Sequence, residues 1–127
     1  MKKAEVEFLT KDQKSVKINC EIADSFSKKM KGLMYREKLE GSQGMLFPFL
    51  IPWQRFFWMK NVKIPLDIIF VNSKNKINKI YEAPVEKGIF YKMYGSNGFC
   101  KYVIETDMGF CKKNKINKYT EIKIEKK

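Results

Sequence analysis

Apolar and polar positions alternate along several short segments of the chain, and this pattern predicts a protein built mainly from strands. The two N-terminal segments and the C-terminal segment repeat with a period of two, which places their apolar side chains on one face. Segments 54–59 and 66–72 are apolar at both parities, which is typical of strands covered on both sides. Strands are expected at residues 4–10, 15–22, 45–47, 54–59, 66–72, 76–81, 101–106 and 119–125.

A helical period replaces the strand period between residues 23 and 36. One apolar stripe there, spaced i, i+4, i+7 and i+8, is made of Phe26, Met30, Leu33 and Met34. Asp24 or Ser25 is expected to cap its start, and Gly32 lies near its end. The spacing predicts a helix of two or three turns that packs on the core. A second helical turn is expected within residues 107–114.

Prolines and glycines predict interruptions between these elements. Pro48 and Pro52 argue against a continuous central strand through 45–59, because proline cannot donate to a strand ladder. Residues 83–99 are expected to be irregular. Many short strands with turn signals between them favour an antiparallel sandwich or barrel over the alternating units of a parallel sheet.

Length and composition indicate one compact domain over residues 1–127. The composition is 44% hydrophobic and 14% aromatic, well above the profile of a disordered chain. Histidine is absent from the sequence, and the cysteines Cys20, Cys100 and Cys111 have no CxxC spacing, which argues against a structural zinc site and imidazole chemistry. We therefore expect no metal and no cofactor, and we expect the cysteines to be buried as small apolar side chains.

A formal charge of +12 raises the question of nucleic-acid binding. Of the 26 basic residues, however, only Arg36 and Arg55 are arginines, and the lysines are spread along the whole chain. We expect weak, non-specific attraction to polyanions. A nucleic-acid-associated protein that uses lysines and exposed aromatics such as Tyr91 and Tyr94 remains the alternative hypothesis.

The N-terminal residues lack the apolar run of a secretory signal, and no segment has the roughly 20 apolar residues of a membrane span. These two observations predict a cytoplasmic protein without a membrane span.

The segment 56–70 mixes charged and apolar side chains in an unusual way. One hypothesis is a structural clasp in which Asp67 accepts hydrogen bonds from loop amides or pairs with Lys60. The other is a ligand site in which Trp58 offers a flat ring, Lys60, Asn61 and Asp67 supply polar groups, and Arg36 joins them. The sequence leaves both hypotheses open.

Glu105, in the apolar segment 101–106, could act with Asp67 as a catalytic acid or base. Two-carboxylate glycoside hydrolysis needs the two groups about 5 to 10 Å apart, and the sequence does not show that they meet. We therefore favour a non-enzymatic protein and assign no catalytic residue.

Five short motifs occur in a fixed order, namely GLMYR at 32–36, GMLF at 44–47, FWMKN at 57–61, PLDIIF at 65–70 and YVIET at 102–106 followed by Gly109. Their order and spacing resemble the DUF192 family, also called UPF0127, an uncharacterised family of archaea and bacteria. Val62 stands where the family commonly has threonine. The resemblance implies a mainly β, antiparallel jelly-roll-like sandwich or barrel with one or two short helices.

The residues and the resemblance together predict a non-enzymatic β domain that binds a small polar ligand or a segment of a macromolecule. Its partner and its oligomeric state are not predicted.

Overall fold

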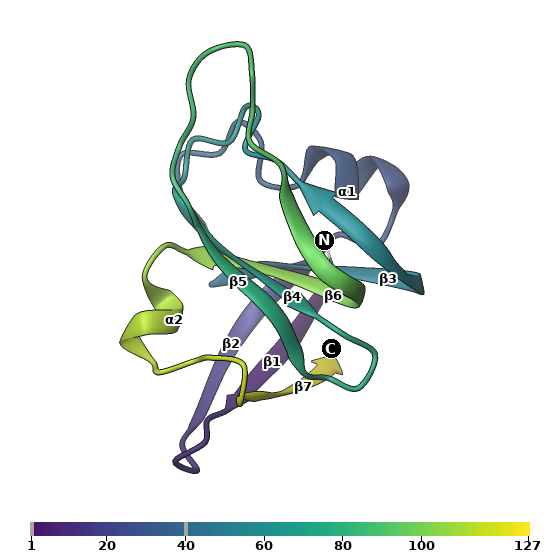
Figure 1. The fold of residues 1–127 in the computed structure, drawn as a ribbon, viewed down its shortest axis with the longest axis vertical. Coiled ribbons are helices and arrows are strands. Elements are labelled where there is room, and N and C mark those ends of the chain that lie inside the picture. The colour runs from purple at the N-terminus through teal and green to yellow at the C-terminus, as the bar shows by residue number, and fades with distance from the viewer. Residues whose placement is uncertain (1, 40) are drawn as a thin grey trace.

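The computed structural model describes residues 2–39 and 41–127, and its seven strands form one mixed sheet with two short helices (Figure 1). The strand order is β5-β4-β6-β3-β2-β1-β7. The strands are β1 (Lys3–Leu9), β2 (Ser15–Ile22), β3 (Gly44–Phe57), β4 (Leu66–Val71), β5 (Ile77–Ala83), β6 (Tyr94–Asp107) and β7 (Glu121–Lys126). The helices are α1 (Phe26–Lys31) and α2 (Phe110–Lys113). The mainly β prediction is confirmed.

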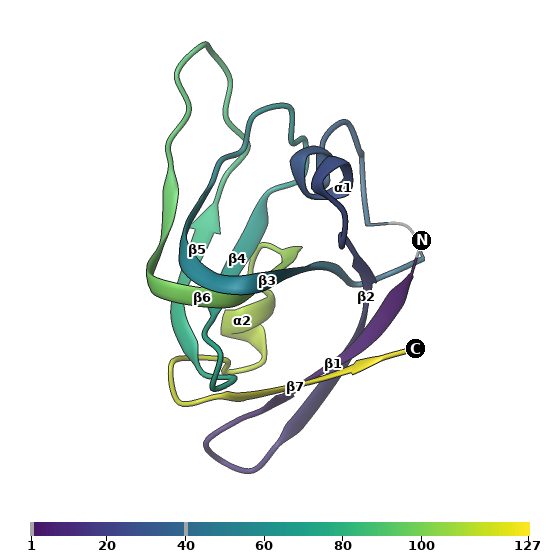
Figure 2. The same cartoon turned by 90° about the vertical axis from the view of Figure 1, so that its right-hand side faces the viewer.

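The predicted antiparallel jelly-roll-like sandwich or barrel is not confirmed. Neighbouring strands are antiparallel except for β2 and β3, which run parallel from the Cys20–Gly44 pair to the Ile22–Leu46 pair. The sheet curls strongly but stays open (Figure 2). Its ends touch at one isolated bridge, between Lys76 and Glu121. Helix α2 lies within the curve of the sheet, where its residues pack against the core (Figure 2).

Apolar side chains form two cores, one on each face of the sheet. The first core lies within the curve and includes Cys111 of α2, together with residues of β1, β2 and β7. The second core lies on the outer face and includes Met45, Phe47 and Ile68. Side chains alternate along a strand, so neighbouring residues of β3, β4 and β6 face different cores. All three cysteines are buried, as the sequence predicted.

β3 and β6 are longer than the sequence predicted, and each has 14 residues. β3 passes through both prolines because its ladder with β6 shifts register between the Pro48–Tyr102 and Trp53–Cys100 pairs. Proline is tolerated at such an irregularity, where the regular ladder of hydrogen bonds is interrupted. β6 begins at Tyr94, inside the segment expected to be irregular.

Gly44 begins β3 at the point where β2 and β6 both pair with it. A Cβ atom at this position would lie 2.6 Å from the carbonyl oxygen of Glu105. The close approach of the two backbones therefore requires glycine at residue 44.

Helix α1 is shorter than predicted, with six residues. Ser25 is the N-cap, and its side chain accepts a hydrogen bond from the Lys28 N–H at 3.2 Å. The expected core-facing stripe is only partly correct. Leu33 is buried beyond the end of the helix, whereas Phe26 is 82% exposed and Met30 is 58% exposed. Neither α1 nor α2, the helices found in the described ranges, has the length and apolar character needed to cross a membrane.

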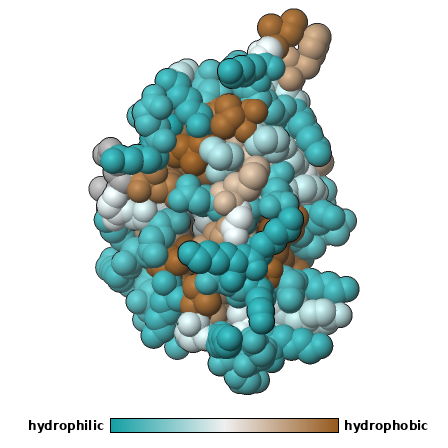
Figure 3. All heavy atoms as spheres, turned by 90° about the vertical axis from the view of Figure 1, so that its left-hand side faces the viewer, coloured by the Kyte–Doolittle hydropathy of each residue, from teal (hydrophilic) through white to brown (hydrophobic). Residues whose placement is uncertain are grey.

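Hydrophilic side chains cover most of the molecular face shown in Figure 3, and apolar side chains form separate patches between them. The segment between β5 and β6 rises as a loop above the sheet in Figure 1. Ile89 and Phe90 of this loop are 83% and 87% exposed.

Candidate functional site

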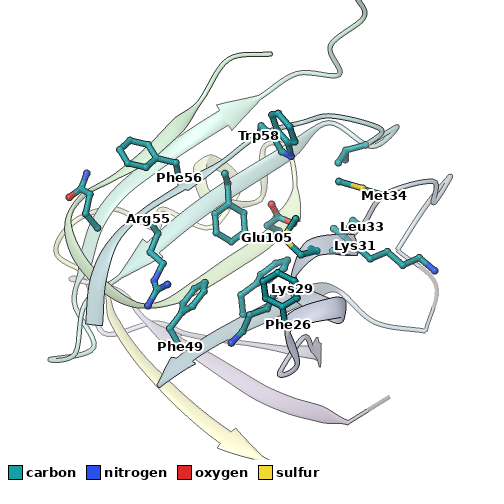
Figure 4. Close-up of a pocket in the computed structure, with 16 residues that line it drawn as sticks. Phe26, Lys29, Lys31, Leu33, Met34, Phe49, Arg55, Phe56, Trp58 and Glu105 are labelled. Carbon is teal, nitrogen blue, oxygen red and sulfur yellow. The ribbon is translucent and has the colours of Figure 1, made fainter. Parts of the chain in front are cut away.

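A cavity of about 600 Å³ lies beside α1, next to β3 and the second core (Figure 4). Its apolar walls include Phe26, Met30, Phe49, Phe57 and Trp58. Its polar lining residues are Lys29, Lys31, Gln54, Arg55 and Glu105. Mainly apolar walls with a few convergent polar groups are typical of small-molecule sites.

The exposed apolar side chains of α1 line this cavity. Phe26 and Met30 repeat at helical spacing, which led the sequence analysis to place them in the core. In the structure the helix stands away from the sheet and buries none of its own residues. The apolar stripe therefore forms one wall of the cavity beside Glu105 and Phe57.

Glu105 is the sole acidic lining residue of the cavity in the part of the chain that the structure describes. It lies on β6 between Met45 of β3 and Ile68 of β4, and it is 5% exposed. No described side chain or backbone group donates a hydrogen bond to its carboxyl or forms an ion pair with it. Burial raises the pKa of Glu105 from 4.5 to about 8, because an ionised carboxylate without a partner is poorly solvated there. Glu105 is therefore mainly neutral at pH 7.

Lys29 and Arg55 form a positive end to the cavity. The Lys29 Nζ lies 4.7 Å from the centroid of the Phe49 ring, and the Arg55 Cζ lies 3.9 Å from the same centroid. Burial and the charge of Arg55 lower the pKa of Lys29. Arg55 donates a hydrogen bond to the Ile51 carbonyl at 2.6 Å, while its Nε is buried without a partner. In Figure 4 these cations lie on the opposite side of Glu105 from Trp58.

Trp58 is the predicted site residue that lines the cavity. Its ring is 41% exposed and packs edge-on against Tyr91 at 5.9 Å between centroids. Lys60 places its Nζ 5.3 Å from the Trp58 ring centroid but does not line the cavity. The polar groups that line the cavity are therefore other residues than the polar groups of the predicted site.

Asn61 holds a neighbouring loop. Its Nδ2 donates a hydrogen bond to the Tyr35 hydroxyl at 2.8 Å, and its carbonyl accepts one from the Tyr35 N–H at 2.8 Å. Asn61 has a φ of 61°, a left-handed conformation that asparagine tolerates well. Lys63 adds a 3.3 Å ion pair with Glu37. These contacts match the clasp hypothesis for this part of the segment.

Asp67 lies on the other face of the sheet from Glu105. It is 1% exposed and accepts hydrogen bonds from the N–H groups of Gly109 at 3.2 Å and Cys111 at 2.9 Å. These are the loop amides of the clasp hypothesis, and the alternative Lys60–Asp67 pair is not found among the described residues. Because Glu105 pairs in register with Ile68, the next residue along β4, Asp67 and Glu105 point in opposite directions. They do not form a carboxylate pair.

Arg36 is engaged elsewhere. Its guanidinium forms an ion pair with Glu21, in which Nη2 donates to Oε1 at 3.4 Å and Nη1 approaches Oε2 more closely. The Ser42 hydroxyl donates to the same carboxylate at 3.3 Å. Arg36 does not line the cavity.

The aromatics named for nucleic-acid binding are only partly accessible. Tyr91 packs against Trp58, and Tyr94 is 2% exposed and packs against Tyr81 at 5.2 Å between ring centroids. The expectation that Tyr94 is exposed was wrong, because Tyr94 begins β6 and faces the second core.

The sequence analysis did not select Lys29 or Arg55. Lys29 is one of many lysines, and nothing in its neighbourhood marks it. Arg55 is one of two arginines and lies among aromatic residues in the sequence. This pattern does not by itself indicate a binding residue, because the contact between Arg55 and Phe49 depends on the fold. Glu105 carried a clearer signal, since it interrupts an apolar strand.

The curled sheet with a partly open, aromatic cavity defines a small β domain with a candidate ligand site. The sequence matches the DUF192 family, described as an uncharacterized ACR, over residues 7–124, so this chain belongs to that family.

Two crystal structures are similar to this fold. One, from Sinorhizobium meliloti 1021 and provisionally described as a transcription regulator, has a TM-score of 0.87 and 29% identity, with 95% of this chain and 92% of that chain covered. The other, a protein of unknown function from Novosphingobium aromaticivorans DSM 12444, has a TM-score of 0.83 and 26% identity, with 94% and 83% covered. Among proteins with curated descriptions, none matches the sequence.

Proposed function

We propose that this protein is a non-enzymatic binding domain that takes up a small, largely apolar ligand in the cavity beside α1. The carboxyl group of Glu105 would be its polar anchor. The proposal rests on one observation, which is that Glu105 is buried at the cavity without a hydrogen-bond partner among the described residues.

An unpartnered polar group in an apolar site costs about 1–3 kcal/mol relative to a satisfied one. A neutral carboxyl offers one O–H donor and one carbonyl acceptor. A ligand with a hydroxyl, amide or carbonyl group would satisfy both and would also cover Phe26 and Met30, which are exposed in the free protein. Binding would therefore satisfy the hydrogen bonds of the Glu105 carboxyl and bury exposed apolar surface at the same time.

Binding is favoured over two-carboxylate hydrolysis because Glu105 is the sole carboxyl group that lines the cavity within residues 2–39 and 41–127. Asp67, the second candidate acid, is held by backbone amides on the other face of the sheet. Two-carboxylate hydrolysis needs a second carboxyl group about 5 to 10 Å from the first.

A thermal-shift screen of small apolar molecules with one hydrogen-bonding group tests the proposal. We expect stabilising compounds whose effect persists in Glu105→Gln, which keeps a neutral donor and acceptor, and is lost in Glu105→Leu and reduced in Trp58→Ala. Lys60→Ala serves as the control, since Lys60 lies near Trp58 but outside the cavity. If the compounds stabilise the Glu105→Leu variant as much as the wild-type protein, they bind at another site.

Nucleic-acid binding is the second candidate function. The charge of +12 favours it, and so does the similarity to the Sinorhizobium meliloti protein described as a transcription regulator. The lengths of α1 and α2, six and four residues, weigh against a helix that reads the major groove.

A further inference from the structure

We infer that the ligand of this cavity is an amphipathic anion whose charged group lies at the end of the cavity that Lys29 and Arg55 form beside Phe49. This inference rests on the proposed function and names the chemical class of its ligand. A carboxylate, sulfonate or phosphate at that end would be attracted by both cations.

Lys29 and Arg55 place two like charges near each other. Lys29 and Arg55 approach one aromatic ring, at 4.7 and 3.9 Å from its centroid, and neither forms an ion pair within residues 2–39 and 41–127. The negative charge of Asp24 acts against the lowering of the Lys29 pKa by burial and by Arg55. The Asp24 carboxylate, however, already forms ion pairs with Lys2 and Lys28, each with 3.6 Å between nitrogen and oxygen. An anion at this position would relieve the repulsion between the two cations.

Arg55 has hydrogen-bond donors that no described residue uses. One guanidinium nitrogen donates to the Ile51 carbonyl, but Nη1 has no partner in the described part of the chain and Nε is buried without one. A planar guanidinium with free donors suits the two oxygens of a carboxylate or phosphate.

The two cations lie apart from Glu105 in the cavity (Figure 4). Burial is the cause of the raised pKa of Glu105, and neither Lys29 nor Arg55 offsets it. In Figure 4 the charged end and the neutral carboxyl of the cavity are distinct points, and the lining between them includes apolar side chains. A matching ligand has an anionic group at one end, an apolar body and a polar group that reaches Glu105.

A matched pair of fluorescent probes tests the charge requirement. The probes 1-anilinonaphthalene-8-sulfonate and N-phenyl-1-naphthylamine share one ring system, and only the first carries an anionic group. We expect both to bind the wild-type protein with a rise in fluorescence, and the sulfonate to bind roughly tenfold more tightly. The difference should shrink with added salt.

Three variants locate the effect. Lys29→Met keeps the apolar stem and should remove most of the sulfonate's advantage while leaving the neutral probe unchanged. Arg55→Lys keeps the charge but loses the planar fork, so it should weaken the sulfonate less. Lys92→Met is the control, because the Lys92 Nζ lies 5.1 Å from the Tyr94 ring centroid, outside the cavity, and it should change neither affinity.

Distinct outcomes separate the two proposals. If both probes bind equally well and Lys29→Met changes nothing, the anion inference is overturned while the cavity remains a binding site. If neither probe binds, or if Met30→Trp at the exposed cavity wall leaves both affinities unchanged, the proposed function itself is wrong. The sulfonate probe is expected to bind more tightly than the neutral probe. If Lys92→Met removes this difference as strongly as Lys29→Met does, the sulfonate binds to dispersed surface lysines and the anion inference is overturned.

Discussion

Two buried carboxyl groups of this protein differ in their surroundings. Asp67 accepts two backbone hydrogen bonds, which compensate for the water it loses on burial. Glu105 has no such donors among the described residues, and burial raises its pKa, which favours the protonated form. One of the two acids is therefore part of the architecture, and the other is available to a ligand.

Glu105→Gln tests the neutral state of this carboxyl. The pKa of Glu105 is ordinarily 4.5 and is about 8 in the folded protein. Between pH 4.5 and pH 8, folding is therefore accompanied by the binding of a proton to this carboxyl. The wild-type free energy of unfolding should therefore fall by a few kcal/mol as the pH rises from about 4.5 to 8, in addition to other changes. The Gln variant should lack this fall, as urea denaturation across the pH range would show. Parallel curves for the two proteins would contradict a neutral Glu105.

At the scale of elements, side chains on both faces of the sheet hold the helices and loops in place. Asn61 and Lys63 hold the loop at residues 35–37 on one face, and Asp67 holds the start of α2 on the other. Helix α2 has four residues, too few to be stable alone. Its position inside the curve of the sheet therefore depends on this carboxylate and on the burial of Cys111.

Asp67→Asn should weaken the link between β4 and α2. An amide cannot accept from both the Gly109 and Cys111 N–H groups as well as a carboxylate does, so we expect a loss of about 1–3 kcal/mol of unfolding free energy. Amide hydrogen exchange at Cys111 should accelerate. Asp107→Asn is the matched control, because Asp107 is exposed and should leave both measurements unchanged. An unchanged Cys111 amide in Asp67→Asn would show that packing alone positions α2.

At the scale of the whole molecule, the charge is large and dispersed. Hydrophilic side chains cover most of the face in Figure 3, and the lysines come from all parts of the chain. A dispersed charge attracts any polyanion without selecting a sequence. The clustered Lys29 and Arg55 are different, because they share one ring at an apolar cavity.

Duplex DNA should therefore bind weakly and without sequence preference. We expect unrelated duplexes to have the same affinity, and the logarithm of the binding constant to fall linearly with the logarithm of salt between about 50 and 200 mM. Fluorescence anisotropy with labelled duplexes measures both. A preference of roughly a thousandfold for one sequence would instead support a transcription-regulator role.

The sequence predicted most of the strands, because alternation and apolar runs are local consequences of a sheet with two covered faces. It was less successful where distant segments compensate for a local conflict. β3 continues through Pro48 and Pro52 because β6 shifts register beside it. The Phe26 and Met30 stripe has the period of a packed helix, yet only the position of α1 relative to β3 decides what it faces.

The sequence by itself therefore determined the mainly β character, the burial of the cysteines and membership of DUF192, since each depends on residue types and their order. The tertiary structure alone decided the open sheet, the side of the sheet on which each carboxyl lies, and the meeting of Lys29, Arg55 and Glu105 at one cavity. The physical reason is that these features depend on strand register and on contacts between residues far apart in the chain, which local patterns do not specify.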